Sequence, residues 1–177
     1  MNIYRLFVQK SLNLLSKDGI FAEIFPLAFA GDLSASQLRR FAFSKFRTLS
    51  FDAFPERDNP QKRVFEAAKM SVCVLVAKNS PPEGDMRMRI NLDRFIDGKG
   101  GCFPIATTAF QQLDPEYMRL PIAGESDYGI LLKMRSKARR LADVSRCSTG
   151  EMDMTFARAA FTTNPDFPEM LRGAGVG

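Results

Sequence analysis

The residue types in this chain of 177 residues restrict the chemistry that it can carry out. Histidine is absent, which excludes Ser-His and Cys-His nucleophilic catalysis and most metal-hydrolase mechanisms. The cysteines Cys73, Cys102 and Cys147 are far apart and odd in number. They indicate reduced thiols in a cytosolic setting rather than a disulfide framework or a zinc site. Catalysis would therefore depend on carboxylates, amides, backbone groups or a bound cofactor.

Two carboxylates lie near the ends of an expected sheet strand, where open α/β sheets bind ligands. Glu23 falls in the middle of that strand, and Asp32 is placed to support the start of the next helix. We assign neither a catalytic role. Cys73 alternates with valines, and we expect it to be buried and unreactive.

The charge is concentrated in the first part of the chain. Residues 1–80 hold 12 Lys and Arg against 7 Asp and Glu, whereas residues 81–177 hold 13 of each kind. A basic balance favours a polyanionic partner, although an ordinary solvated surface explains it equally well. No apolar run approaches the length of about 18 residues that a transmembrane helix needs. We therefore expect a cytoplasmic protein without membrane association.

The first part of the sequence has the pattern of an αβ unit. Residues 3–17 carry apolar side chains at helical spacing, and Gly19 is a plausible end to that helix. Residues 20–25 form an apolar run that ends at Pro26, which is typical of a buried strand. Ser34 and Gln37 have capping-box spacing and predict a second helix that runs to about residue 47. We expect Arg39, Arg40 and Lys45 on its exposed side.

Further along the chain, two strands are expected at residues 49–53 and 70–77. A polar loop joins them, so the simplest arrangement is an antiparallel pair at the end of a mixed sheet. Residues 79–84, Asn-Ser-Pro-Pro-Glu-Gly, break the pattern and predict a domain boundary. Beyond it we expect a half-exposed strand at 86–90, a turn at 98–101 and a helix at about 126–141.

These elements follow one another in an order that resembles a known family. The helix ends in Leu14-Leu15-Ser16-Lys17-Asp18-Gly19, the strand ends at Pro26, and the capped helix contains Leu38-Arg39. The strand pair follows, with Val64-Phe65 at a set interval before Ser71, and two later segments match more weakly, Gly150–Thr155 and Leu171–Gly173. In this order the chain resembles the gamma-class adenine-N6 DNA methyltransferases of the Taq type, including those of single-chain restriction-modification enzymes.

The resemblance implies a fold and a division of the chain. Residues 1–80 would form the C-terminal half of a Rossmann-like methyltransferase catalytic sheet, α/β in class, with an antiparallel terminal strand pair. Residues 81–177 would form a connector and the beginning of a partial α+β target-recognition region. The family's glycine-rich loop for S-adenosylmethionine and its catalytic tetrapeptide have no counterpart here. Ser80-Pro81-Pro82-Glu83 is the nearest match to the tetrapeptide, lacks its aromatic residue, and is better explained as a linker.

The resemblance therefore predicts a fragment whose parent transfers a methyl group from S-adenosylmethionine to adenine in double-stranded DNA, with or without a fused restriction nuclease. The fragment alone would bind no cofactor or metal and would be inactive. Two alternatives stay open: a non-catalytic module that binds DNA or a catalytic subunit, and a fragment of an RNA methyltransferase. Half a sheet exposes an apolar edge and face, so we also expect possible self-association.

Such enzymes extrude the target base and hold it between apolar faces. The resemblance places a base-stacking residue at Phe65, with Phe54 as the second candidate, and the alternative for either is a place in the core. Nearby cations would contact phosphates or serve the recognition region, and the alternative for each is a plain solvated surface, which is the more common explanation of such charges. The candidates for DNA binding are Lys62, Arg63, Lys69, Arg87, Arg89, Lys133, Lys137, Arg139 and Arg140.

Overall fold

The computed structural model describes residues 2–96, 101–137, 139, 143–146 and 166. The chain divides into two compact units, residues 1–138 and 139–177, and all the elements named below belong to the first. In chain order they are α1 (Tyr4–Asn13), β1 (Ile20–Pro26), α2 (Ala28–Gly31), the 3-10 helix η1 (Leu33–Ala35), α3 (Ser36–Lys45), β2 (Arg47–Phe54), β3 (Val72–Lys78), β4 (Asp85–Ile90), β5 (Cys102–Ala106), α4 (Thr108–Leu113) and α5 (Glu125–Lys137). The predicted α/β class is confirmed.

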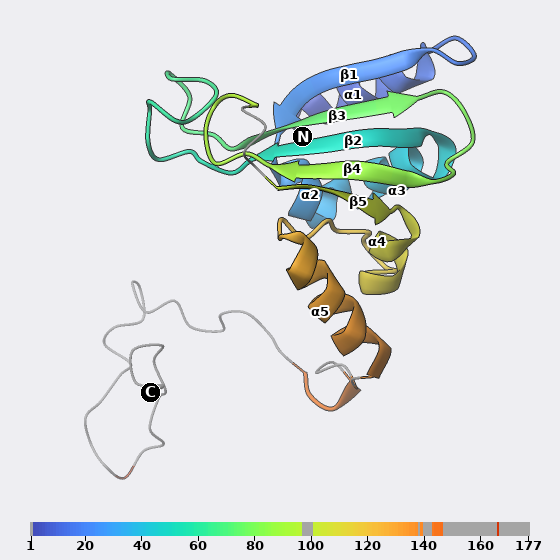
Figure 1. The fold of residues 1–177 in the computed structure, drawn as a ribbon, viewed down its shortest axis with the longest axis vertical. Helices are drawn as coiled ribbons and strands as arrows, with labels where there is room; N and C mark the ends of the chain where they lie inside the picture. Colours follow the sequence, from blue (N-terminus) through green and yellow to red (C-terminus); the bar gives the residue numbers. More distant parts are fainter. Residues whose placement is uncertain (1, 97–100, 138, 140–142, 147–165, 167–177) are drawn as a thin grey trace. The chain divides into compact units, whose positions relative to one another are not determined.

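The five strands form one open, mixed sheet in the order β1-β3-β2-β4-β5 (Figure 1). Strand β3 lies between β1 and β2 and is antiparallel to both, so β1 and β2 are parallel to each other. Strand β4 is parallel to β2 and antiparallel to β5. The predicted antiparallel pair is therefore present as β2 and β3. The expectation that it ends the sheet is wrong, because β4 adds a further strand beside β2 and buries Met86 and Met88 against the same core.

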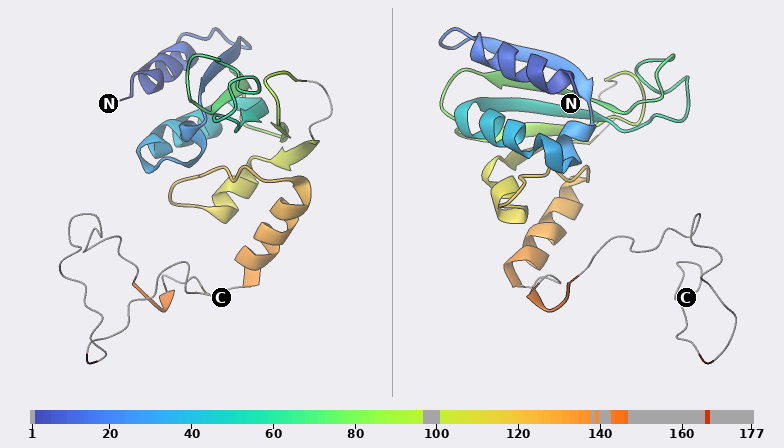
Figure 2. Two further views of the ribbon diagram at one scale, coloured as in Figure 1. Left: turned by 90° about the vertical axis from the view of Figure 1, so that its left-hand side faces the viewer. Right: turned by 180° about the vertical axis from the view of Figure 1, so that it is seen from behind.

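Among the described elements, helices α1, α2 and α3 cover one face of this sheet, as the two views in Figure 2 show. Alternate strand residues point toward them, and these form the core together with the apolar sides of the helices. Phe25, Phe29, Phe43 and Phe51 are all buried in that layer, where Phe29 contacts each of the other three rings. The opposite face, which β1, β3, β2 and β4 turn toward the viewer in Figure 1, carries no helix among the described elements.

Helix α1 ends four residues before the predicted limit. The following turn places Asp18 at a φ of 61°, in the left-handed region, and the Gly19 N–H donates to the Ser16 carbonyl at 2.9 Å. A Cβ on Gly19 would lie 2.9 Å from that carbonyl oxygen. Glycine is required at position 19 because a side chain there would be too close to the Ser16 carbonyl. The left-handed backbone angle belongs to Asp18, the residue before it.

Helix α3 differs from its prediction in two ways. It begins at Ser36 after the short helix η1, and its N-terminus has no side-chain cap, so the expected capping box at Ser34 does not form. Arg39, expected on the exposed side, is completely buried. The following residue, Arg40, is only half-buried and donates to the carbonyls of Pro115 and Glu116.

The predicted boundary at residues 80 and 81 falls between β3 and β4, two strands of the same sheet. The assignment of the two sides to catalysis and target recognition stays a prediction. Strand β5 and helix α4 were not predicted: Pro104 interrupts the run of strand-forming residues, and proline is tolerated there because β5 is an edge strand. Residues 150–155, 171–173 and most of the predicted turn at 98–101 lie outside the described residues.

Candidate functional site at the carboxyl ends of the parallel strands

Three parallel strands, β1, β2 and β4, end at the same edge of the sheet. Open α/β sheets bind ligands in the crevice outside such carboxyl ends. Strand β1 is followed directly by α2, β2 by the long segment 55–71, and β4 by the segment 91–96. The two long segments project together from this edge, on the left in Figure 1. They contain the predicted stacking residue Phe65, so this edge is the candidate site.

The two predicted stacking residues have different environments. Phe65 lies in the loop between β2 and β3 and is 43% exposed. Phe54 is the last residue of β2, pairs with Val72 of β3 and is 6% exposed. Of these two residues, Phe65 is therefore the one that offers a ring face to an incoming base, whereas Phe54 is buried within the fold. The stacking role itself stays a prediction.

Most of the predicted cations in the β2–β3 loop bind within the loop. The Lys69 Nζ lies 2.9 Å from an Asp58 carboxylate oxygen. Arg63 donates to the backbone carbonyls of Glu66, at 2.9 Å from its Nε, and of Arg57, at 3.1 Å. These contacts close the loop on itself and hold Phe65 at its surface. Lys62 is exposed, so it is the predicted cation in this loop that is best placed to reach a phosphate.

The remaining predicted cations are spread over other elements. Arg87 and Arg89 lie on β4, on the sheet face without helices, where Arg87 is exposed and Arg89 half-buried. Lys133 of α5 and Arg139 beyond it are exposed. The side chains of Lys137 and Arg140 lie outside what the structure describes. The candidates described in the first unit thus lie on three separate elements, the β2–β3 loop, β4 and α5, and the DNA-binding role of all nine stays a prediction.

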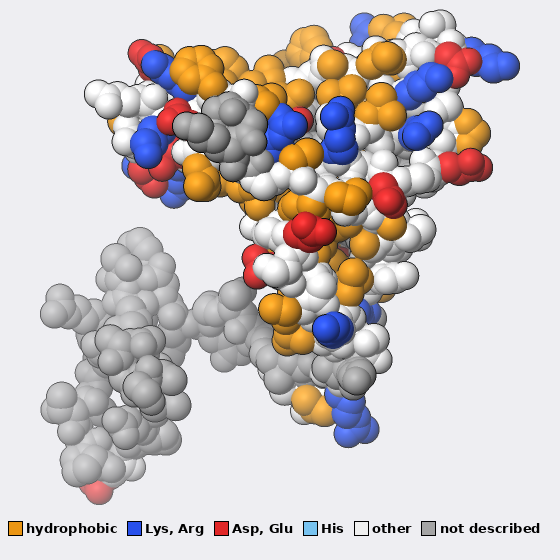
Figure 3. Space-filling view, viewed as in Figure 1, with side chains coloured by type: hydrophobic (Ala, Val, Ile, Leu, Met, Phe, Trp, Pro, Cys, Tyr) orange, Lys and Arg blue, Asp and Glu red, His pale blue; other side chains and the backbone are white. Residues whose placement is uncertain are grey.

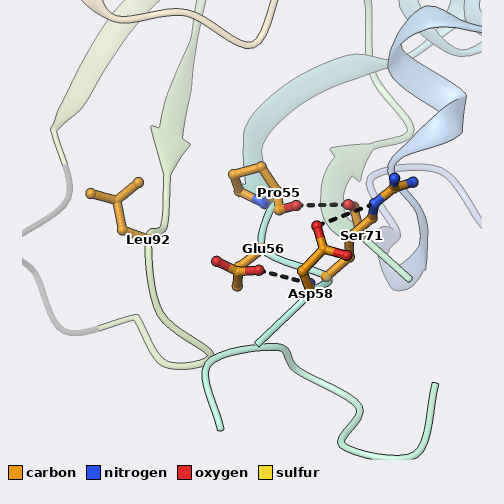
Figure 4. Close-up of a pocket in the computed structure, with 6 residues that line it drawn as sticks. Pro55, Glu56, Asp58, Ser71 and Leu92 are labelled. Carbon is orange, nitrogen blue, oxygen red and sulfur yellow. Dashed lines mark hydrogen bonds and ion pairs between the residues drawn. The ribbon is translucent and has the colours of Figure 1, made fainter. Parts of the chain in front are cut away.

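A hollow of about 480 Å³ opens beside the candidate edge (Figure 4). The β2–β3 loop and the loop after β4 line it, through Pro55, Glu56, Arg57, Asp58, Ser71 and Leu92. The Ser71 hydroxyl donates to the Pro55 carbonyl at 2.7 Å and ties the two ends of the β2–β3 loop together.

Both carboxylates in this hollow are stabilised in their charged form. Glu56 accepts hydrogen bonds from the backbone N–H groups of Asn59 and Asp58, which lowers its pKa. The pKa of Asp58 is lowered by its contact with Lys69. Ionised carboxylates accept hydrogen bonds from N–H donors. Asp58 is already paired with Lys69 and lies 3.8 Å from the Nε of Arg57, which also lines the hollow, so Glu56 is the carboxylate better placed to accept from a ligand.

The loop after β4 contains a second exposed aromatic ring that the sequence reading did not single out. Phe95 is 65% exposed, and the Arg94 guanidinium lies 5.1 Å from its ring centre. Arg94 also pairs with Glu66, the neighbour of Phe65 in sequence. This ion pair joins the two loops and brings both aromatic residues to the same edge. The signal was present in the sequence, because Arg94-Phe95 repeats the cation-near-phenylalanine pattern of Arg63 and Phe65.

A buried polar cluster supports these loops from within the sheet. On the face without helices, the Asp52 carboxylate of β2 lies 3.4 Å from Arg89 of β4. Burial raises the pKa of Asp52, and the nearby Arg89 opposes that shift. Asn91 follows β4, is buried, and donates from its backbone and side chain to the Ala53 carbonyl at 2.8 and 3.3 Å. These contacts fix the point at which the loop after β4 leaves the sheet.

Among the described residues, no group of three His, Cys, Asp or Glu side chains could hold a metal ion. The free thiol of Cys73 is buried in the core, and burial raises its pKa, in agreement with the prediction that it is buried. Within the same described part of the chain, no helix has the length and apolar character needed to cross a membrane.

No protein-family model and no curated protein sequence matches this chain. Three solved structures of restriction-modification proteins resemble it weakly. The type IIG restriction endonuclease BpuSI is 12% identical, with a TM-score of 0.41 over 51% of this chain and 10% of that protein. A modification subunit from Vibrio vulnificus YJ016, assigned to a type I restriction enzyme, is 17% identical, with a TM-score of 0.41 over 49% of this chain and 18% of that one.

A third neighbour comes from a structure of a type I restriction-modification system described for its assembly and conformational transition. It is 14% identical, with a TM-score of 0.42 over 89% of this chain and 35% of that protein. The chain thus spans between a tenth and about a third of the lengths of these neighbours.

Proposed function

We propose that this chain is the C-terminal part of the catalytic domain of a DNA adenine-N6 methyltransferase of the restriction-modification type. The parent enzyme would transfer a methyl group from S-adenosylmethionine to the amino group of an adenine in DNA. One observation carries the proposal: the loop that joins the antiparallel strands β2 and β3 holds an exposed Phe65 at the carboxyl edge of the sheet. The resemblance places its stacking residue at this point.

The chemistry of the neighbouring hollow supports the same proposal. An extruded adenine presents a flat ring and an amino group that carries two N–H donors. Phe65 offers the ring face, and the carboxylate of Glu56 in the same loop is an acceptor for N–H donors. The chain's own residues would then bind and orient the base. Holding a reactant in the right geometry lowers the barrier of the reaction.

The residues present do not fit S-adenosylmethionine. In the proposed family a glycine-rich loop follows a sheet strand and holds the cofactor, whereas here β1 runs directly through Leu27 into the short helix α2. We therefore expect the chain alone to bind no S-adenosylmethionine. Calorimetric titration with S-adenosylmethionine checks this expectation, and micromolar affinity would contradict it.

The stacking role is tested by the variant Phe65→Ala in binding to a single-stranded deoxyadenosine oligonucleotide. A stacked ring contributes about 1–3 kcal/mol per base, so affinity should fall about 5- to 150-fold. Phe7→Ala is the matched control, because Phe7 is also exposed but lies on α1. Fluorescence anisotropy at low salt measures both. If the wild-type chain does not bind, or if the two variants bind equally well, the proposed site is wrong.

A stand-alone DNA-binding module is the alternative. It predicts that this chain binds duplex DNA with an affinity that falls steeply as salt rises, because cations on the protein displace counterions. The internal pairing of Lys69, Arg63 and Arg94 argues against a large phosphate-binding surface. A gel-shift titration at several salt concentrations distinguishes the two, since half of a catalytic domain should bind duplex weakly and without sequence preference.

A further inference from the structure

Two exposed phenylalanine rings lie on the two loops that project from the carboxyl edge of the sheet (Figure 1). Phe65 belongs to the β2–β3 loop and Phe95 to the loop after β4. Phe95 is the more exposed of the two, and Leu92 and Ile96 in the same loop are also exposed. Exposed apolar side chains that gather on one loop indicate a binding surface. The base-stacking role proposed for Phe65 does not account for this second surface.

The Arg94 side chain determines which face of the Phe95 ring is free. Its guanidinium carbon lies over that ring, 5.1 Å from the ring centre. The same guanidinium forms an ion pair with Glu66 of the β2–β3 loop. The face of Phe95 that is turned toward Glu66 is therefore covered, and the opposite face is the one left open to solvent.

This arrangement argues against a single base held between both rings. Phe65 is the neighbour of Glu66 in sequence, so a base stacked on Phe65 lies on the Glu66 side of the ion pair. A base on the free face of Phe95 would lie on the other side. The Arg94 guanidinium and the Phe95 ring would separate the two, so the rings are suited to two different bases.

The surroundings of the rings favour nucleobases over an apolar protein partner. Arg63 and Arg94 lie within two residues of the rings in sequence, and bases stack on aromatic rings and on guanidinium planes. Lys62 is exposed in the β2–β3 loop, where a cation can contact a phosphate. Glu56 lines the hollow between the two loops and accepts from N–H donors. Burying these charged groups against an apolar protein surface would be costly.

We propose that Phe95 is a second base-stacking platform, which binds the base next in the strand to the one on Phe65. The ligand of this edge is thus a single-stranded stretch of two bases, and the Glu66–Arg94 ion pair sets the separation of the two platforms. Every base has a flat π-face, so the second position should accept any of them. This inference rests on the proposed function in one respect, that Phe65 receives the target base.

The test compares two dye-labelled pentanucleotides that have the same number of phosphates. One carries a single adenine at its centre and abasic sugars elsewhere, and the other carries two adjacent adenines. Fluorescence anisotropy at low salt measures their binding to the whole chain. The wild type should bind the two-base probe about 5- to 150-fold more tightly, which is the contribution of one further stacked base. Phe95→Ala should abolish this preference, whereas Phe65→Ala should weaken the binding of both probes.

Two further variants separate a direct contact from a change in loop structure. Glu66→Gln removes the charge that pairs with Arg94, and the two-base preference should fall by up to about fivefold, because exposed ion pairs contribute little. Glu83→Gln is its control, in the exposed turn between β3 and β4. Phe7→Ala, on α1, is the control for Phe95→Ala, because both rings are exposed. Both controls should keep the wild-type preference.

The outcomes distinguish this inference from the proposed function. The second platform is overturned if Phe95→Ala keeps the two-base preference, if the wild type binds both probes equally, or if it binds neither, in which case the rings would form a protein contact. A preference unchanged in Glu66→Gln would overturn the role of the ion pair. A preference that depends on Phe95 but not on Phe65 would support the second platform and count against the proposed function.

Discussion

The two faces of the sheet have different compositions although they share the same strands. Toward the helices, Phe21 and Phe25 of β1, Phe51 of β2 and Leu75 of β3 are all buried. On the other face, Ile20 and Ile24 of β1 are exposed, while β2 and β4 contribute the Asp52–Arg89 pair. Figure 3 views this second face: hydrophobic side chains gather along its β1 side, and Lys and Arg side chains lie across its middle.

This difference separates the residues that stabilise the fold from those that are available for binding. The face under the helices follows the alternation expected for a half-buried sheet and completes its own core. The other face leaves apolar side chains of β1 in solvent. It also carries the buried Asp52–Arg89 ion pair, and such a pair contributes little to stability. Substitutions on the two faces should therefore have unequal effects on folding.

Truncation of Phe51 gives the largest expected effect. This ring is completely buried and stacks on Phe29 at 6.5 Å between ring centres. Phe51→Ala should lower the free energy of unfolding by about 3–5 kcal/mol. Ile24→Ala, on the open face, should lower it by less than about 1 kcal/mol. Urea denaturation of both variants measures the difference. Similar costs would mean that the open face is already covered in solution.

Arg39 of α3 gives a second test of the side of the sheet that the helices cover, because it is a cation that is completely buried there. Its Nε donates to the Tyr117 carbonyl at 3.0 Å, and its Nη1 donates to the carbonyls of Phe29 and Asp32 at 2.6 and 2.8 Å. Burial lowers the pKa of Arg39. The side chain thus joins α3 to the segment after β1 and to the segment before α5.

Arg39→Ala would leave these carbonyls without their donor in a buried site. The free energy of unfolding should fall by about 2–4 kcal/mol. Arg40→Ala is a matched control on the same helix, because Arg40 also donates to two carbonyls but is only half-buried. That variant should lose less than about 1 kcal/mol. Equal losses in thermal and urea denaturation would contradict the importance of the buried position.

Arg39 also shows which parts of the fold can be predicted from the sequence. Strands β1 to β4, the β2–β3 pairing and the helices α1, α3 and α5 could be predicted because hydrophobic spacing reports local structure. The burial of Arg39 could not, since its acceptors include Tyr117, which is 78 residues away along the chain. For the same reason, the place of β4 beside β2 depends on contacts between distant segments.

The candidate site was predictable to a similar degree. Phe65 was located from the order of motifs, and the structure shows its ring at the surface. The engagement of Arg63 and Lys69 within their own loop was not predictable, because a sequence shows the charge of a side chain but not its partner. The position of Phe95 at the same edge as Phe65 was not predictable either, because it depends on the Arg94–Glu66 ion pair that joins the two loops.

The smallest expected effect concerns the pH dependence of stability and tests the polar half of the open face. Burial raises the pKa of Asp52 in the folded protein, with Arg89 and Arg87 opposing the shift. The folded state then binds more protons than the unfolded state between the two pKa values. The contribution of Asp52 to stability should therefore fall as pH rises through that window, which begins near the ordinary pKa of about 4.

Asp52→Asn removes this titration and leaves the other carboxylates unchanged. The free energy of unfolding of the variant minus that of the wild type should increase from pH 4 upward and become constant above the folded pKa of Asp52. Asp58→Asn is the control with the opposite sign, because Lys69 lowers the pKa of Asp58 and its contribution is lost as pH falls. Urea denaturation across the pH range measures both differences. If the stability differences of both variants changed with pH in the same direction, Asp52 would have to be solvated and ionised in the folded state. The Asp52–Arg89 part of the open face would then be as accessible to a partner as the exposed Ile20 and Ile24 of β1.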